Sequence, residues 1–91
     1  MPYMKRAALL EPVFAQRNLL PDGAWVEIRL ARDARGFAYR LAYLRDGDCL
    51  LCYENPRLQE HARILRGRAA AYVFRSVEQL RYDFERDVEA L

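Results

Sequence analysis

The stretch from Phe37 to Asn55 constrains the fold of this chain more than any other part of it. Two runs of aromatic and aliphatic residues, at 37–44 and 49–54, flank the dipeptide Asp46-Gly47. Asp-Gly accepts a positive φ at both central positions of a tight turn, which is the geometry that joins two antiparallel strands into a twisted hairpin. We therefore expect a β-hairpin at the centre of the chain.

Side-chain alternation then predicts which residues share a face of this hairpin. With Asp46-Gly47 as a two-residue loop, one face carries the pairs Leu44 with Cys49, Ala42 with Leu51 and Arg40 with Tyr53, and the other carries Tyr43, Leu50, Leu41, Cys52, Tyr39 and Glu54. Both faces are largely apolar, as expected of a strand pair that is covered on two sides or curled into a half-barrel. The polar exceptions gather at the open end of the hairpin, where we expect the chemistry to lie.

The rest of the chain predicts three further strands, at about 14–20, 25–32 and 72–74, in addition to 37–44 and 49–54. Pro21-Asp22-Gly23 predicts a turn, because Pro presets φ at the first corner and Gly accepts the positive φ that follows. Residues 56–71 contain Pro56, Gly67 and many arginines. This composition predicts a basic loop.

A helix is predicted at 76–90. Ser76 and Gln79 have the spacing of a capping box, in which each side chain bonds the other residue's backbone amide. Apolar residues recur at helical spacing and form a stripe for packing on the sheet, namely Val77, Leu80, Phe84, Val88 and Leu91. The fold class predicted for residues 1–91 is a single α+β domain with an antiparallel β-meander of four to five strands packed against a C-terminal α-helix.

Hydropathy and charge bound the environment of the protein. No apolar run approaches the roughly 18 residues of a membrane span, and Glu11-Pro12 ends the short apolar stretch near the N-terminus, so we expect a cytoplasmic protein without membrane contact. Residues 1–75 hold 13 Lys or Arg and eight Asp or Glu, a balance of +5, whereas residues 76–91 hold two and five, a balance of −3. The excess of positive charge in residues 1–75 favours a nucleic-acid partner.

The two cysteines, Cys49 and Cys52, form a C-x-x-C pattern. Residues three apart in a regular strand face opposite ways, so we expect two buried hydrophobic side chains rather than a disulfide or half of a zinc site. The chain has a single histidine and no nucleotide-binding glycine motif. Neither a metal nor an organic cofactor is predicted.

The candidate functional residues lie where the hairpin opens into the basic segment. His61 can act as a general acid or base, with Glu54 and Tyr53 beside it. The residues that could bind phosphate are Arg40, Asn55, Arg63, Arg66 and Arg68. Metal-independent RNA cleavage needs such a set, because a base takes the 2′-hydroxyl proton, an acid protonates the leaving oxygen and cations stabilise the phosphorane.

Several segments together resemble the TumE-type toxins of bacterial type II toxin–antitoxin pairs, and the resemblance spans nearly the whole chain. They are D-G-A-W-V-E-I-R at 22–29, Y-R-L-A-Y at 39–43, Y-E-N at 53–55, E-H at 60–61, Y-V-F-R-S-V-E-Q-L at 72–80 and D-F at 83–84. The resemblance implies a small toxin that acts on RNA or translation and is paired with a helix-turn-helix antitoxin.

This chain departs from the family pattern at three positions, two of which lie in these segments. Glu54 and Glu60 stand where the family has Asp, and Arg63 stands where the family has a second histidine. If the two histidines divide the acid and base roles, one of those roles is lost here or is replaced electrostatically by Arg63.

Two hypotheses follow from the sequence. In the first, the protein is a toxin, a metal-independent ribonuclease or translation inhibitor that acts on RNA. In the second, it is a non-catalytic module that binds nucleic acid or protein through the basic segment 57–68. The sequence predicts neither the RNA target nor the oligomeric state.

Overall fold

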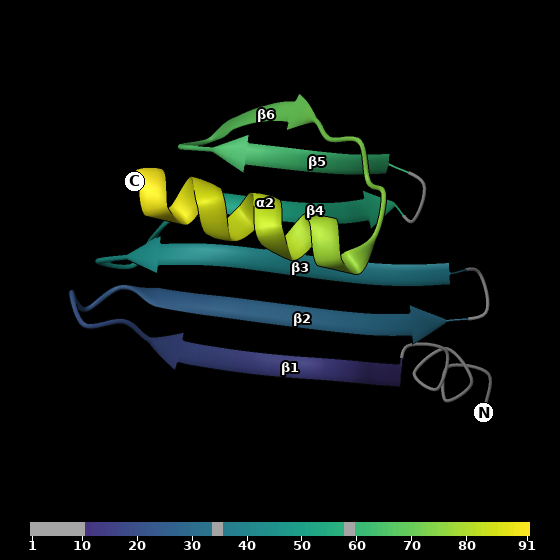
Figure 1. Cartoon of the computed structure of the whole chain (residues 1–91), viewed down its shortest axis with the longest axis horizontal. Helices are drawn as coiled ribbons and strands as arrows, with labels where there is room; N and C mark the ends of the chain where they lie inside the picture. The colour runs from purple at the N-terminus through teal and green to yellow at the C-terminus, as the bar shows by residue number, and fades with distance from the viewer. Residues whose placement is uncertain (1–10, 34–35, 58–59) are drawn as a thin grey trace.

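The computed structural model describes residues 11–33, 36–57 and 60–91, which form one antiparallel sheet with a helix against one face (Figure 1). The strands are β1 (Glu11–Leu19), β2 (Trp25–Asp33), β3 (Gly36–Arg45), β4 (Asp48–Arg57), β5 (Glu60–Leu65) and β6 (Arg68–Ala71), and the helix is α2 (Val77–Ala90). Each strand pairs with the next one along the chain. The α+β class and the meander are confirmed, but the described residues form six strands rather than four to five.

The predicted turns have the expected backbone geometry. Asp46 and Gly47 have φ of 52° and 82°, and Arg45 pairs with Asp48 across them, so the central hairpin has a two-residue loop. Gly23 has φ of 89°, and its amide donates to the carbonyl of Leu20. Both turns therefore use the positive φ that their sequences predict.

A β-bulge changes the pairing within the central hairpin. Leu44 pairs with Cys49 but Tyr43 pairs with Leu51, so Leu50 is an extra residue on β4. From the bulge onward every pair is shifted by one residue, and Arg40 lies opposite Glu54 rather than Tyr53. The predicted partners Ala42 with Leu51 and Arg40 with Tyr53 are therefore wrong.

The bulge also changes the prediction for the cysteines. Cys49 and Cys52 pair with Leu44 and Ala42, which are alternate residues of β3, so both cysteines lie on the same face. Both are unbridged; Cys52 is buried and Cys49 is exposed. Burial raises the pKa of the Cys52 thiol to about 12, so this thiol stays protonated at neutral pH.

The segment predicted as a basic loop is mostly sheet. Within it, residues 60–65 and 68–71 form β5 and β6, joined by a turn in which Arg66 and Gly67 have φ of 50° and 82°. Residues 58–59 of that prediction lie outside the described part. The strand predicted at 72–74 is also wrong, because these residues belong to the connection from β6 to α2.

The helix α2 lies across β3 and β4 in Figure 1 and covers the centre of one face of the sheet, which we call the helix face. The amide of Gln79 donates to Ser76 Oγ, 3.1 Å away, so Ser76 is the N-cap as predicted. The apolar stripe of α2 packs on side chains of β2, β3 and β4, and the largest fully buried members of this core are Tyr53, Phe84, Leu41, Leu51 and Leu80. No described element covers the other face, which we call the uncovered face. No helix in the described part is long and apolar enough to cross a membrane.

Candidate functional site

A tyrosine and the single histidine meet on the helix face, at the open end of the central hairpin. Tyr39 Oη lies 2.9 Å from His61 Nδ1, so β3 and β5 are linked across the intervening strand β4. The imidazole is stacked on Phe74, with ring centroids 5.0 Å apart and planes 7° apart, and Tyr39 stacks on both rings. Tyr39, His61 and Phe74 form the aromatic cluster discussed below.

The donor and the acceptor in the contact between Tyr39 and His61 depend on the protonation of the imidazole. Burial raises the pKa of Tyr39 to about 12, with the nearby Cys52 thiol adding to the rise, so the phenol keeps its proton at neutral pH. A neutral phenol can donate that proton to Nδ1, and in this arrangement Nε2 of a neutral imidazole carries the ring hydrogen. In an imidazolium, Nδ1–H donates to the phenol oxygen instead, and Nε2 again carries an N–H donor.

Asn55 holds the strand that carries Tyr39. Its side chain is 5% exposed, accepts a hydrogen bond from the Tyr39 amide (2.8 Å) and donates one to the Phe37 carbonyl (2.7 Å). A second irregularity in the pairing of β4 with β5 begins after Glu54. The predicted phosphate-binding residue Asn55 is thus engaged with the backbone of β3, next to the aromatic cluster.

Tyr53 and Arg63 join a second group beneath the helix. Arg63 Nε lies 2.7 Å from Asp87 Oδ2 and 3.2 Å from Tyr53 Oη, and the Tyr53 hydroxyl also donates to Asp87. Burial of Asp87 works against its ionisation, but the hydrogen bonds from Tyr53 and Arg63 outweigh it and lower the pKa of Asp87 below its usual range. Burial raises the pKa of Tyr53 to about 12, with the bond to Asp87 adding to the rise. This group ties α2 to β4 and β5.

Tyr72, in the connection from β6 to α2, forms a further polar contact with the helix. Its hydroxyl donates to Asp83 Oδ2 over 2.6 Å, and its ring meets Tyr53 edge-on at 4.9 Å. Burial, followed by the hydrogen bond to Asp83, raises the pKa of Tyr72. Asp83 also accepts a hydrogen bond from Gln79 Nε2 at 2.8 Å, within α2. The bond from Tyr72 to Asp83 fixes the connection that carries Phe74 to the helix.

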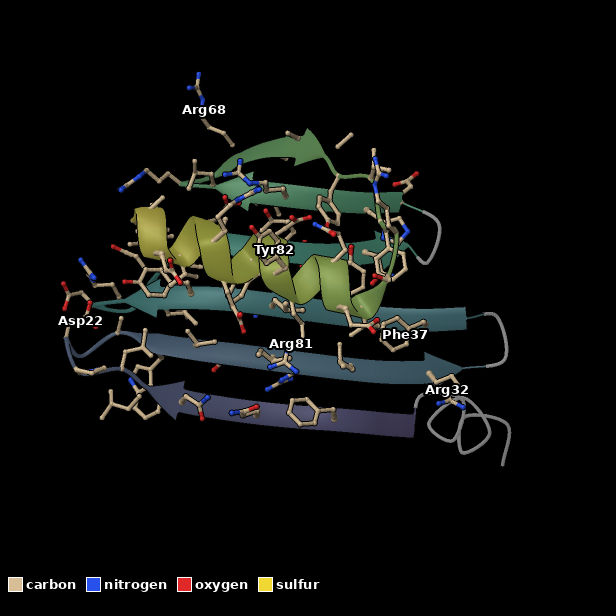
Figure 2. The ribbon with its side chains drawn as sticks, in the orientation of Figure 1. Asp22, Arg32, Phe37, Arg68, Arg81 and Tyr82 are labelled. Atoms are coloured by element: carbon tan, nitrogen blue, oxygen red, sulfur yellow. The ribbon has the colours of Figure 1, made fainter. Side chains whose placement is uncertain are left out.

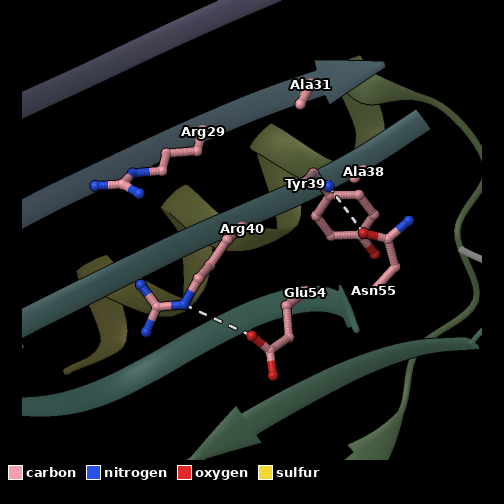
Figure 3. A pocket seen from close by; sticks show the side chains of 7 residues that line it. All are labelled: Arg29, Ala31, Ala38, Tyr39, Arg40, Glu54 and Asn55. Atoms are coloured by element: carbon pink, nitrogen blue, oxygen red, sulfur yellow. Dashed lines mark hydrogen bonds and ion pairs between the residues drawn. The ribbon is translucent and has the colours of Figure 1, made fainter. Parts of the chain in front are cut away.

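Glu54 and Arg40 lie on the uncovered face, away from His61. Arg40 Nε lies 3.6 Å from Glu54 Oε1, and the two residues line a hollow of about 240 Å³ (Figure 3). The other residues that line it are Arg29, Ala31, Ala38, Tyr39 and Asn55. The structure therefore does not bring the predicted catalytic residues Glu54 and His61 together, because the sheet separates their side chains.

Arg66 and Arg68 lie at the other end of β5 from His61. Arg66 is in the β5–β6 turn, five residues beyond His61, which in an extended strand is a separation of roughly 16 Å. Figure 2 shows Arg68 beyond the β6 edge of the sheet, far from Phe37 at the open end. Both arginines are exposed, and neither side chain forms an ion pair within the described residues.

An open hollow of about 540 Å³ gives access to His61 along the β6 edge of the sheet. His61, Glu60 and Tyr72 line it together with the small side chains Ala62, Ala69, Ala70 and Ala71. His61 is half-buried and is one of the residues that line this hollow. The described residues contain no group of three or more His, Cys, Asp or Glu that could hold a metal ion.

Sequence reasoning missed three contributors, namely Tyr39 and Phe74 around His61, and Asp87 as the partner of Arg63. Tyr39 is one of the polar residues at the open end of the hairpin, which is the signal that could have identified it. No local pattern connects Asp87 with Arg63, because 24 residues separate them.

Comparison of the chain with models of known protein families, with curated proteins and with solved structures found no match.

Proposed function

We propose that this protein is an RNA-directed toxin of the TumE type and that it acts as a metal-independent ribonuclease at the aromatic cluster. The observation that carries the proposal is the hydrogen bond between Tyr39 Oη and His61 Nδ1 in a ring stack that borders an open hollow. The segments that carry the resemblance supply this cluster from separate parts of the chain: Tyr39, Asn55, His61 and Phe74 come from four of them.

His61 is assigned the role of general acid. RNA cleavage by transesterification forms a bond between the 2′-oxygen and phosphorus and breaks the bond between phosphorus and the 5′-oxygen. In this role His61 is an imidazolium whose Nδ1–H donates to Tyr39 Oη, and its Nε2 proton goes to the departing 5′-oxygen, which leaves a neutral imidazole; Tyr39, 5% exposed, positions the ring. The products are a 2′,3′-cyclic phosphate and a 5′-hydroxyl.

Glu60 is assigned the role of general base. Its side chain leaves the opposite face of β5 from that of His61, but both residues line the open hollow at the sheet edge, and Glu60 is the carboxylate among the described residues that line it; it takes the proton of the 2′-hydroxyl. The Arg63 guanidinium, in contrast, is bound to Asp87 and Tyr53 and serves to hold the helix on the sheet. In this proposal Arg63 therefore does not take the role of the family's second histidine, and the carboxylate of Glu60 supplies the base.

Induced expression in a bacterial host tests the assignment. The wild-type protein should arrest growth and fragment RNA, whereas His61→Ala should do neither while remaining folded by circular dichroism. Glu54→Gln is the matched variant on the uncovered face, and it should arrest growth as the wild type does. If a folded His61→Ala protein still arrests growth, the reaction centre is not at the aromatic cluster. The same conclusion follows if Glu54→Gln is the only variant that no longer arrests growth.

As an RNA-directed toxin the protein would act in the cytoplasm and would be held inactive by a helix-turn-helix antitoxin. A second candidate function is a non-catalytic RNA-binding module, and it is favoured by Arg29, Arg66 and Arg68, which are exposed and form no ion pair within the described residues. It predicts RNA binding that weakens steeply with salt and no cleavage under any condition. The two functions are separated by the presence of cyclic-phosphate products.

A further inference from the structure

The uncovered face carries two arginines directly opposite each other. Arg29 of β2 pairs in register with Arg40 of β3, so their side chains leave neighbouring strands on the same face. Figure 3 shows both side chains extending in the same direction along the strands, away from Ala31 and Ala38. Like charges directly opposite each other destabilise a sheet, so this arrangement calls for an explanation.

The acidic neighbours compensate only part of this charge. Glu27 lies 3.2 Å from Arg17 and 3.8 Å from Arg40, and Glu54 lies 3.6 Å from Arg40. Arg29 is exposed and has no ion-pair partner in the described part of the chain. Among the described residues of this face, the Arg29 guanidinium is therefore not neutralised by a carboxylate. The neighbouring Arg40 guanidinium is neutralised only through the long contacts with Glu27 and Glu54.

The surroundings of the pair suit a small anion. Arg29 and Arg40 line the hollow of about 240 Å³ together with the methyl groups of the cross-strand pair Ala31 and Ala38, and Glu54, whose carboxylate contacts Arg40, lines it as well. Two guanidinium forks on adjacent strands can each offer two N–H donors to the oxygens of one phosphate group. Such a shallow, open site suits a phosphodiester that continues into a strand on both sides.

We infer that Arg29 and Arg40 form a binding site for a backbone phosphate of an RNA strand on the uncovered face. The inference rests on the proposed RNA-directed function and adds a contact on the face opposite His61. Tyr39 and Arg40 are consecutive residues, so the aromatic cluster and this site are separated by the thickness of the sheet. An RNA bound at both places would pass around the open end of the central hairpin.

The first experiment tests the anion site by itself, with inorganic phosphate as the probe. The Nε–Hε resonances of the arginines are followed by NMR during a phosphate titration at constant ionic strength. Those of Arg29 and Arg40 should shift and saturate together, whereas that of Arg68, exposed and unpaired at the β6 edge, should stay in place. Equal shifts at Arg68, or none at Arg29, would overturn the site.

The second experiment tests RNA as the occupant, using fluorescence anisotropy of a labelled oligouridylate. All proteins carry His61→Ala, so that the RNA stays intact. Arg29→Gln should weaken binding roughly three- to tenfold near 0.1 M salt and lower the salt slope by about one. Arg68→Gln removes the same charge and should weaken binding by less than about twofold.

The outcomes separate this inference from the proposed function. Equal weakening by both substitutions would show dependence on net charge alone and would overturn the inference. Phosphate binding without RNA binding would assign the hollow to a free phosphate and would also overturn it. If Arg29→Gln binds RNA as tightly as its parent while His61 remains essential for cleavage, the inference fails and the proposed function stands.

Discussion

Replacing Asn55 by alanine should destabilise the protein strongly and disturb the aromatic cluster. The Asn55 side chain is buried, and it makes hydrogen bonds of 2.8 Å and 2.7 Å to the backbone of β3 at Tyr39 and Phe37. Alanine would leave a backbone amide and a carbonyl without these partners, at a cost of about 1–3 kcal/mol each. The expected loss is therefore roughly 2–6 kcal/mol, out of the roughly 5–14 kcal/mol typical of a domain of this size.

Urea unfolding measures this loss as a lower midpoint at an unchanged slope. Asn55→Asp sharpens the test, because it keeps an acceptor for the Tyr39 amide but places a second oxygen against the Phe37 carbonyl. It should be at least as destabilising as alanine. Gln79→Ala removes an exposed hydrogen bond to Asp83 and should stay within about 0.5 kcal/mol of the wild type. A loss below about 1 kcal/mol for Asn55→Ala would refute the role given to this residue.

Further predictions concern the core and the titrating groups. Phe84→Ala should cost about 3–5 kcal/mol in thermal or urea unfolding, whereas Tyr82→Ala, 60% exposed in the wild type, should cost little; a fully stable Phe84→Ala protein would contradict the packing of α2. The pKa of Asp87 is lowered in the folded state, so its contribution to stability is present above its unfolded pKa of about 4 and is lost as pH falls through the folded pKa. Asp87→Asn should therefore flatten the acid limb of a plot of stability against pH, and an unchanged acid limb would count against the contact with Arg63. Tyr39→Phe should remove part of the absorbance change near pH 12 in an alkaline titration, since the pKa of Tyr39 is raised to about 12; an undiminished change there would argue against its burial.

The local elements follow from short sequence patterns. The two-residue turn at Asp46-Gly47, the N-cap at Ser76 and the helix stripe depend on residues within a few positions of one another, so the sequence alone predicts them. The bulge at Leu50 could not be predicted in this way. Its neighbours on β4 are apolar on both faces, so the hydrophobic pattern does not distinguish one register from the next.

The hairpin of β5 and β6 was missed for a related reason. Pro56, Gly67 and the arginines predict a loop, and the run Ala69-Ala70-Ala71 has little intrinsic preference for strand. Pairing with the edge of β4 overrides this local preference. The signal that could have identified the hairpin is Arg66-Gly67, a second two-residue turn with positive φ like Asp46-Gly47.

The composition of the candidate site depends on the register across three strands. Sequence order placed Glu54 and Tyr53 beside His61, but neighbouring residues of a strand face opposite sides, so at most one of them can share a face with the histidine. The contact of His61 with Tyr39 spans 22 residues and follows from the pairing of β3 with β4 and of β4 with β5. The contact between Tyr39 and His61 can be predicted only when the bulge at Leu50 and the pairing of β4 with β5 are known.

The most direct test of the account is incubation of purified protein with RNA in the presence of EDTA, followed by analysis of the cleaved ends. The account predicts 2′,3′-cyclic phosphate ends with the wild-type protein, and none with folded His61→Ala protein or with an RNA that carries 2′-deoxy substitutions. Cleavage by His61→Ala at the wild-type rate, or dependence on a divalent metal ion, would contradict the reaction centre proposed here.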